Sequence, residues 1–326
     1  MPLGLRWGNV TAVGERLDGL VRLEVDELPC IAYPRLTGEV EVGDVVLVNG
    51  RAVELGLGSG GFDVLYANLT RGLQLPVAEG AHVMTLPYAP GQIATRFAEE
   101  DAHDAGERER LDGMQVVCIG LHSQLAPVCA ALRGRRVVYV QLGGGALPVS
   151  LSDTVRVLKA RRLLDTTIAV SPCLDGDLQC VTAAAALVQA VERGAEAVVC
   201  GIGPGIVGTA SRWGHGGLAV ADAANTASAL GALPIVAPRV SFADERARHR
   251  GLSHHTRSAL ALCLGDVRVA WPLGLERPDG VEVTEVDAAG WESACAHLPL
   301  SHMGRGPGED PWFFAAAFAA GRLAAG

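Results

Sequence analysis

Hydrophobic and polar positions alternate in short pieces between Arg6 and Leu69, and glycine, aspartate and proline residues separate these pieces. The pieces are "GLVRLEV", "PCIAY", "EVEVGDVVLVN" and "AVELGL". Such alternation is typical of β-strands with one buried face. Because no long helical pattern fits between them, the segment predicts a small β-barrel over residues 1–75, of SH3-like or OB-like topology.

The pattern changes after Met114, where continuous apolar segments alternate with helical ones such as "SDTVRVLKA" and "QCVTAAAALVQAVERG". The apolar segments are "QVVCIG", "RVVYVQL", "TTIAV", "AVVCGIG", "PIVAP" and "VRVAW". Strands that are apolar on both faces belong to a parallel sheet with helices on both sides. The fold class is therefore α/β, with a doubly wound, mostly parallel sheet over residues 114–326.

The two ends of this α/β domain carry further signals. At its start, residues 76–113 contain the acidic run "EEDAHDAGERERLD" and are expected to connect the two domains. Near its end, "VEVTEVD" predicts an edge strand. The segment "GEDPWFFAAAFAAGRLA" predicts a closing helix, with Asp310 as its cap and Pro311 in its first turn.

Composition narrows the function classes. With 36 acidic and 27 basic residues the formal net charge is −9, which argues against general binding to nucleic acid or to a membrane surface. The eight cysteines form no C-x-x-C pair and read as buried thiols in a reducing compartment. The sequence begins without the pattern of a signal peptide, and no run has the length of a membrane span. A cytoplasmic location is therefore expected.

Unusual residues gather in the segments that follow the predicted strands of the α/β domain. These segments are "GLHSQ", "LGGGALPVSLSD", "SPCLDGDLQC", "GIGPGIVGTASRWGHGG" and "PRVSFADERARHRGLSHHT". They hold nearly all of the glycine-rich and histidine-rich stretches of the domain, whereas the return turns are ordinary. Because ligands bind beyond the carboxyl ends of the strands in open α/β sheets, we expect one composite site there.

Glycines and arginines in these segments favour an anionic ligand. "GPGIVG" satisfies G-x-G-x-x-G after a strand and would let backbone amides approach a phosphate, but a tight structural turn explains the same glycines. The nearby arginines would neutralise phosphate or carboxylate. Alternatively, "FADERARHR" is a solvated helix in which Asp244 and Glu245 pair with Arg248 and His249. The candidate ligand-binding residues are Gly143, Gly144, Gly145, Gly203, Gly205, Gly208, Thr209, Arg212, Arg248, Arg250 and Ser253.

Catalytic groups can be drawn from the same segments in several ways. Ser123, an aspartate and a histidine follow the chain order of α/β-hydrolase triads, but "GLHSQLA" is not G-x-S-x-G, and Ser123 also fits a helix N-cap. "DGD" places two carboxylates on one turn, which suits a divalent metal but is also common turn chemistry. The candidate catalytic residues are His254, His255, Asp175, Asp177, Ser123 and His122, and the candidate metal ligands are Asp175, Asp177, His215 and His255.

The stretch "RHRGLSHHT" has a predicted structural role as well. Ser253 is expected to cap a helix whose first turn contains His254 and His255, close to the composite site. Two adjacent side chains point in different directions, so we expect one of these histidines to act in the site and the other to support it.

Several of these motifs, taken in order, resemble a known family. "GLHSQLAPV", "GGGALP", "GPGIVGT", "PRVSFAD", "RHRGLSHHT" and "MGRGPGEDP", behind a β-rich N-terminal segment, are similar to the bacterial family catalogued as domain of unknown function 3866. The resemblance spans nearly the whole chain. It implies a bacterial cytoplasmic protein of this architecture and no particular activity.

The leading hypothesis is a protein that binds a small anionic ligand, a nucleotide or a phosphorylated metabolite, beyond the parallel strands. A hydrolase or transferase is favoured over a sensor, because a sensor has no need of several titratable side chains beside hydroxyls and carboxylates. The competing hypothesis is a non-enzymatic sensor or scaffold protein. A divalent metal stays open as a cofactor, neither nucleic acid nor membrane is expected as a partner, and an exposed apolar barrel face would favour a homodimer.

Overall fold

The computed structural model describes residues 4–57, 60–75, 77, 79–101 and 110–326. The chain divides into two compact units, residues 1–96 and 97–326, and each unit has its own hydrophobic core. The sequence places the end of the barrel domain at residue 75 and the connecting segment at 76–113. Residues 102–109 of the predicted acidic linker lie outside the described residues.

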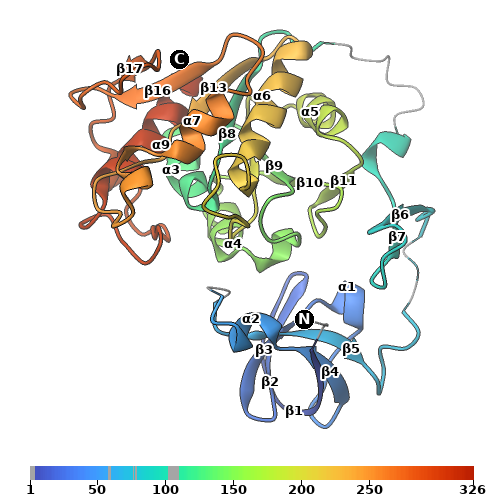
Figure 1. Cartoon of the computed structure of the whole chain (residues 1–326). Helices are drawn as coiled ribbons and strands as arrows, with labels where there is room; N and C mark the ends of the chain where they lie inside the picture. Colours follow the sequence, from blue (N-terminus) through green and yellow to red (C-terminus); the bar gives the residue numbers. More distant parts are fainter. Residues whose placement is uncertain (1–3, 58–59, 76, 78, 102–109) are drawn as a thin grey trace. The chain divides into compact units, whose positions relative to one another are not determined.

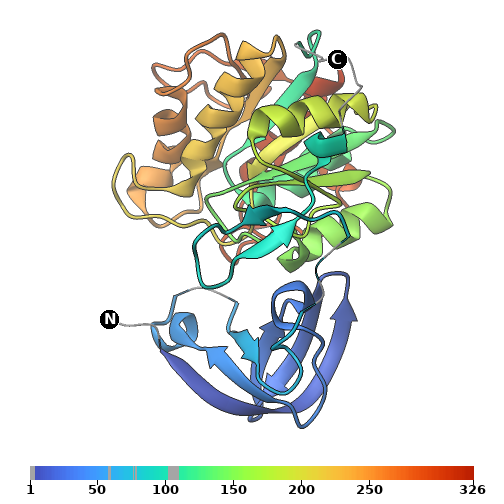
Figure 2. The same cartoon turned by 90° about the vertical axis from the view of Figure 1, so that its right-hand side faces the viewer.

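The first unit contains a closed five-stranded barrel, as the alternating pattern predicts (Figure 2). The strand order is β1-β2-β3-β5-β4, β4 pairs with β1 to close the barrel, and β3 and β5 are parallel. Of the two topologies predicted for the barrel, this five-stranded arrangement resembles the OB-like one. The strands are β1 (Leu5–Leu17), β2 (Leu20–Val25), β3 (Leu28–Ala32), β4 (Val45–Asn49) and β5 (Asp63–Asn68).

One predicted strand of this unit is wrong. "AVELGL" contains the helical turn α2 (Arg51–Glu54), because its apolar residues Val53, Leu55 and Leu57 are exposed and have no buried face to share with a sheet. The unit also contains a second short helix, α1 (Pro34–Thr37), and a hairpin that the sequence pattern does not predict. The hairpin strands are β6 (Val83–Thr85) and β7 (Ile93–Thr95).

The second unit is built on an eight-stranded sheet in which every pair of neighbours is parallel, in the order β11-β10-β9-β12-β8-β13-β16-β17 (Figure 1). This confirms the α/β class, and the predicted edge strand is β17. The strands are β8 (Gln115–Ile119), β9 (Val137–Leu142), β10 (Thr166–Val170), β11 (Leu178–Cys180), β12 (Ala197–Ile202), β13 (Leu233–Ala237), β16 (Arg268–Pro272) and β17 (Thr284–Val286).

Helices cover both faces of this sheet. Alternate residues of the central strands enter two separate cores, which explains why the strands are apolar throughout. One core contains α3 (Leu125–Ala131), α4 (Asp153–Ala160), α8 (Trp291–Ala294) and α9 (Pro311–Ala325), and the other contains α5 (Ala183–Glu192), α6 (Ala219–Ala229) and part of α7 (His254–Leu260).

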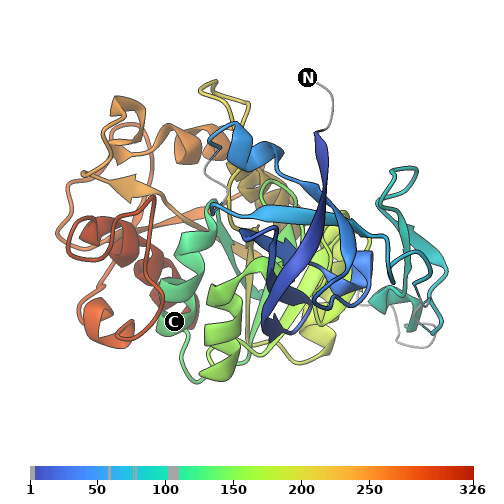
Figure 3. The same cartoon turned by 90° about the horizontal axis from the view of Figure 1, so that it is seen from below.

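Helix α5 begins later than predicted, and α9 begins where predicted but without the expected capping hydrogen bond. "QCVTAAAALVQAVERG" first forms part of the edge strand β11, and α5 begins only after Thr182, whose side chain accepts a hydrogen bond from the Ala185 amide. Helix α9 is the predicted closing helix and packs along α3 (Figure 3). Asp310 holds its N-cap position, but the carboxylate makes no capping hydrogen bond. In the described part of the chain, none of the helices combines the length and apolarity needed to cross a membrane.

Candidate functional site

Four histidines from the segments after β12 and β13 lie against one another. His215 precedes the 3-10 turn η4 (Gly216–Leu218), His249 ends η5 (Ala247–His249), and His254 and His255 open α7. The ring centroids of His215 and His255 are 3.8 Å apart in a stacked arrangement, and those of His254 and His255 are 4.4 Å apart. His249 lies 4.8 Å from each of these two rings. We call these four residues the histidine cluster.

The first turn of α7 explains how two of them reach the cluster. Ser253 is the N-cap, as predicted, and its Oγ accepts a hydrogen bond from the His255 amide at 3.2 Å. The same Oγ lies 2.7 Å from Nδ1 of His249. Adjacent helical positions differ by about 100°, and both rings still contact His215, so both belong to the histidine cluster. That one of them acts in the site and the other supports it stays a prediction.

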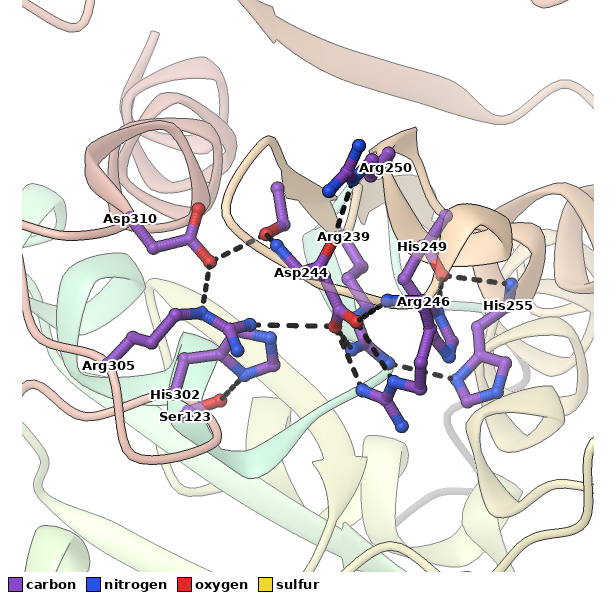
Figure 4. Close-up of polar contacts among 12 residues, drawn as sticks. Ser123, Arg239, Asp244, Arg246, His249, Arg250, His255, His302, Arg305 and Asp310 are labelled. Atoms are coloured by element: carbon purple, nitrogen blue, oxygen red, sulfur yellow. Dashed lines mark hydrogen bonds and ion pairs between the residues drawn. The ribbon is translucent and has the colours of Figure 1, made fainter.

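A buried carboxylate organises the segment between β13 and α7. Asp244 is 1% exposed and lies 2.9 Å from Nη2 of Arg239 and 2.8 Å from Nη2 of Arg246 (Figure 4). Arg305 approaches the same carboxylate at 3.5 Å. The short strands β14 (Val240–Ser241) and β15 (Gly251–Leu252) pair at the base of this segment.

This arrangement corrects the alternative in which "FADERARHR" is a solvated helix. Only Ala247–His249 form a short 3-10 turn, and Asp244 pairs with other arginines instead of with Arg248. The physical reason is burial: a carboxylate enclosed by protein is stabilised by direct pairing with guanidinium groups, and Arg239 supplies one from the end of β13.

A second group of side chains comes from the loop before α9 (Figure 4). Nδ1 of His302 lies 3.4 Å from Oγ of Ser123, and the His302 ring stacks on Phe313 at 3.8 Å. Arg305 contacts Asp310 at 3.2 Å, and Ser241 donates a hydrogen bond to Asp310 at 2.7 Å. The Asp310 carboxylate is thus used in the network beside Asp244, which explains why it does not cap α9.

Burial keeps these histidines neutral. Burial, together with neighbouring His215 and Arg239, lowers the pKa of His255 to about 2. Burial also lowers the pKa of His249 and of His302 to about 3, and Arg239 adds to the effect in both. The pKa values of His215 and His254 are likewise lowered, first by burial.

Charge acts on the carboxylate in the opposite way. Burial by itself would raise the pKa of Asp244, but hydrogen bonds and charge from Arg246, with charge from Arg239, hold it well below its usual range. Buried Arg239 in turn has its pKa lowered to about 10, mainly by burial. The site therefore combines an ionised carboxylate, several guanidinium groups and neutral imidazoles.

In the segment after β8, the structural role belongs to Gln124 and not to Ser123, for which the sequence pattern predicts a helix cap. Ser123 lies in the 3-10 turn η2 (His122–Gln124) and does not cap α3. Instead, the buried side chain of Gln124 connects two segments. Its Oε1 accepts hydrogen bonds from the backbone amides of Gly120 and Leu121, and its Nε2 donates to the backbone carbonyls of Ala237 and Pro238. Gln124 thus joins the ends of β8 and β13.

His122 is buried away from the histidine cluster. Its Nδ1 lies 3.2 Å from the carbonyl of Ile202, and its Nε2 lies 2.6 Å from Oγ of Ser152. Ser152 is also the N-cap of α4, where its side chain accepts from the Val155 amide. Burial lowers the pKa of His122 to about 4. With both ring nitrogens engaged, His122 has the contacts of a structural histidine.

The two aspartates of "DGD" have their own partners. Asp175 accepts a hydrogen bond from Ser150 at 2.8 Å, and Asp177 pairs with Lys159 and with Thr167. Among the described residues, the only group of three or more histidine, cysteine or acidic side chains suited to a metal is His215, His254 and His255. The predicted metal set is therefore divided: His215 and His255 come together, while Asp175 and Asp177 lie elsewhere.

The glycine loops after β9 and β12 pack against each other. A Cβ on Gly144 would lie 2.7 Å from the Gly216 carbonyl oxygen, and a Cβ on Gly145 would lie 2.3 Å from that of Gly203. The amide of Val207 donates to the carbonyl of Gly144 at 2.9 Å. Close backbone approach accounts for Gly144, Gly145 and Gly203, whereas Gly205 has a positive φ of 69° and open space around it, as in a tight turn.

Other predicted ligand-binding residues of these loops have local contacts. Thr209 hydrogen-bonds Ser211 and the Gly214 carbonyl, and the guanidinium of Arg212 lies 4.3 Å from the Trp213 ring centroid. A ligand role for Gly143, Gly144, Gly145, Gly203, Gly205, Gly208, Thr209 and Arg212 stays a prediction.

An open pocket of about 450 Å³ is lined by the segments that follow β13 and β16. Its walls include Arg248, Arg250 and His254, three residues that the sequence singles out, together with Arg257 and Arg277. By contrast, the cavity between the ends of β8 and β13 has only about 10 Å³, roughly the room for one water molecule. Of these two spaces, only the pocket that follows β13 and β16 is large enough for a small-molecule ligand.

The charges of this pocket are only partly compensated, because four arginines line it together with two acidic residues, Glu276 and Asp279. Arg277 pairs with Glu285, and Arg257 donates to the Asp279 carbonyl at 2.7 Å. Arg250 uses its Nε on the carbonyl of Asp244 at 2.9 Å. Arg248 is exposed and forms no ion pair with any described residue.

Sequence reasoning misses the residues that arrive from distant segments. Arg239 stands inside a predicted site segment and His302 and Arg305 stand in a much later loop. No local spacing shows that Arg239 and Arg305 share Asp244 or that His302 meets Ser123. The usable signal was the loop "SHMGRGPGEDP", which places a histidine, an arginine and two acidic residues just before a buried helix.

Of three comparisons with known proteins, one finds a match. No curated protein and no solved structure matches the chain. A family model described as a protein of unknown function, DUF3866, matches residues 29–321 and so covers nearly the whole chain. The resemblance predicted from the motifs is thereby confirmed, and the chain belongs to the DUF3866 family.

Proposed function

We propose that the protein binds a small anionic ligand in the pocket that follows β13 and β16. The observation that carries this proposal is the meeting of Arg248, Arg250 and His254 in one open pocket of about 450 Å³. Guanidinium groups bind phosphate and carboxylate through paired hydrogen bonds. Arg248 is free to form such contacts.

The lining of the pocket favours a nucleotide within this ligand class. Trp271 and Leu252, 2% and 7% exposed, supply apolar surface, and Phe242, which is 55% exposed, adds an aromatic wall. A ligand with a planar base and a phosphate would use both this surface and the arginines. A sugar phosphate would use the arginines alone.

Within this proposal a hydrolase or transferase is favoured over a sensor. His254 lines the pocket and is also part of the histidine cluster. A bound anion would therefore lie beside neutral imidazoles, and its negative charge would raise their lowered pKa values toward the range in which they accept a proton. The alternative, a sensor that binds without turnover, is separated from it by assaying product.

Calorimetric titration with ATP, glucose 6-phosphate and inorganic phosphate tests the proposal. We expect ATP to bind the wild-type chain, and an Arg248→Ala/Arg250→Ala double variant to bind at least about 10-fold more weakly, since each charge-assisted contact is worth about 1.5–3 kcal/mol. Arg161→Ala, which changes an exposed arginine at the end of α4, is the matched control and keeps wild-type affinity. Equal affinity in the double variant and the control would overturn the proposal, as would failure of all three compounds to bind.

A further inference from the structure

One ring nitrogen from each of three histidines, His215, His254 and His255, lies close to the other two. The three nitrogens all lie within 4.8 Å of one another. The residues come from two segments, the loop after β12 and the first turn of α7, so the grouping is not a by-product of neighbouring sequence positions alone. His215 is 6% exposed, and His254 and His255 are half-buried.

The hydrogen bonding of these rings is incomplete. Both ring nitrogens of His215 and Nε2 of His254 are buried without a hydrogen bond of ordinary length and angle, and the one backbone group that acts on the pKa of His215 is that of Arg212. Leaving a buried polar atom unsatisfied costs about 1–3 kcal/mol, so such atoms call for an explanation. The structural histidine His122, by comparison, engages both of its ring nitrogens.

The surroundings suit a metal ligand set of neutral imidazoles. A histidine binds a metal ion only when the coordinating nitrogen is unprotonated, and burial favours the neutral form of all three rings. Positive charge faces the set from Arg239, whose Nη1 makes a long contact of 3.5 Å with Nδ1 of His255, and from Arg248 and Arg246, which act on His254. Asp244, 2.9 Å from Nη2 of Arg239, offsets that charge.

The donor types select among metals. Mg²⁺ and Ca²⁺ prefer oxygen ligands, whereas three imidazoles suit Zn²⁺ and leave a fourth position open. Zn–N distances of about 2.0–2.1 Å in tetrahedral geometry place the ligand nitrogens roughly 3.4 Å apart. The ligand nitrogens therefore need to move closer together by about 1 Å, and the stacked rings of His215 and His255 must tilt toward the ion.

We propose that His215, His254 and His255 bind one Zn²⁺ ion. The site goes beyond the anion-binding proposal and does not depend on it, because the ligand here is the metal alone. His254 also lines the arginine pocket, so one of the three proposed ligands is shared between the zinc site and that pocket.

Zinc stoichiometry tests the site directly. The full chain is stripped with a chelator, dialysed against Zn²⁺ and analysed for bound metal, and we expect one tightly bound ion per chain. His215→Ala and His255→Gln each lose at least about 100-fold in affinity, the upper end of the loss known for outer-shell partners. His297→Ala removes an exposed histidine of the same unit and keeps one ion per chain.

Two further measurements keep the result clear. Co²⁺ bound in place of Zn²⁺ shows visible d–d bands without thiolate charge-transfer absorption, which separates this site from the eight cysteines of the chain. Circular dichroism shows whether each variant folds, and the Co²⁺ spectrum of the wild type decides the question if a variant does not. Arg248→Ala is expected to keep one zinc ion, because Arg248 lines the anion pocket and is not one of the three proposed zinc ligands. The zinc test therefore remains valid if the anion titration fails. No bound ion in the wild type, thiolate bands in the Co²⁺ spectrum, or unchanged zinc affinity in both folded variants would overturn the inference.

Discussion

Each unit of the chain holds a buried aspartate that pairs with arginine, Asp44 in the barrel and Asp244 in the second unit, and the two sites differ in what surrounds them. In the barrel, Asp44 is 1% exposed and is paired with Arg71 at 2.8 Å. It also accepts hydrogen bonds from the side chain of Asn68 and the amide of Glu41. These three partners, Glu41, Asn68 and Arg71, all lie within residues 41–71 of the same unit, so the carboxylate ties together local structure.

Asp244 in the second unit gathers its partners over a longer distance. Three guanidinium groups, those of Arg239, Arg246 and Arg305, share Asp244 and the neighbouring Asp310. Positive charge is therefore in surplus there, and Nε of Arg239 and Nε2 of His302 are buried without partners. The satisfied network around Asp44 stabilises the fold, whereas excess charge and unpaired buried atoms call for an explanation, which the proposed anionic ligand would provide.

The largest expected difference comes from neutralising the two carboxylates. Asp244→Asn leaves Arg239, whose side chain is 4% exposed, without its counter-charge, and we expect a loss of about 3–5 kcal/mol in the free energy of unfolding of residues 97–326. Asp44→Asn should cost the barrel only about 1–3 kcal/mol, because the partner Arg71 is 37% exposed and can be hydrated again. Hydrogen exchange in increasing urea, followed by mass spectrometry, reports each unit separately. Equal losses in the two units would remove the comparison.

An intermediate effect is expected from pH. His122 and His302 stay neutral in the folded state down to about 4 and about 3, while unfolded histidine takes up a proton near 6.5. The unfolded state thus binds more protons below pH 6.5, and stability of residues 97–326 falls as pH falls, by about 1.4 kcal/mol per buried histidine at pH 5.5.

The barrel should respond at lower pH. Burial by itself would raise the pKa of Asp44, but hydrogen bonds from Arg71 and the Glu41 amide hold it below 3.8. Its stabilising contribution is present above that value and is lost only as the pH falls below it. Urea unfolding of the metal-free chain at pH 7.5 and 5.5 checks both expectations, and His302→Gln should reduce the pH response of the second unit. A barrel that weakens first would contradict this assignment.

The smallest effect is expected at Ser123. Its Oγ lies 3.4 Å from Nδ1 of His302, a long contact, and Nε2 of His302 has no carboxylate partner among the described residues. Ser123→Ala should therefore change the free energy of unfolding by less than about 0.5 kcal/mol and leave zinc binding unchanged. Thermal denaturation and the zinc titration measure the two quantities. If an enzymatic activity is found and this variant loses it, the triad interpretation returns with His302 as the base.

Local patterns predicted those parts of the site that depend on neighbouring residues. The cap at Ser253 and the two histidines after it follow from the first turn of one helix. The placement of Gln124 could not be predicted in this way, because its amide joins the ends of β8 and β13, which are adjacent in the sheet but more than a hundred residues apart in the chain. The assignment of the cap to Ser123 was wrong for the same reason.

By itself, the sequence determined a barrel followed by a parallel α/β sheet, because the spacing of apolar residues reports directly on which faces of a strand are buried. It also determined that the polar residues follow the carboxyl ends of the strands. Only the tertiary structure decided that His215 joins His254 and His255 while Asp175 and Asp177 lie elsewhere. The order of the strands in the sheet determines which of the following loops are neighbours, and β12 lies between β8 and β9. This order depends on pairing between distant segments, which the local spacing of apolar residues does not report.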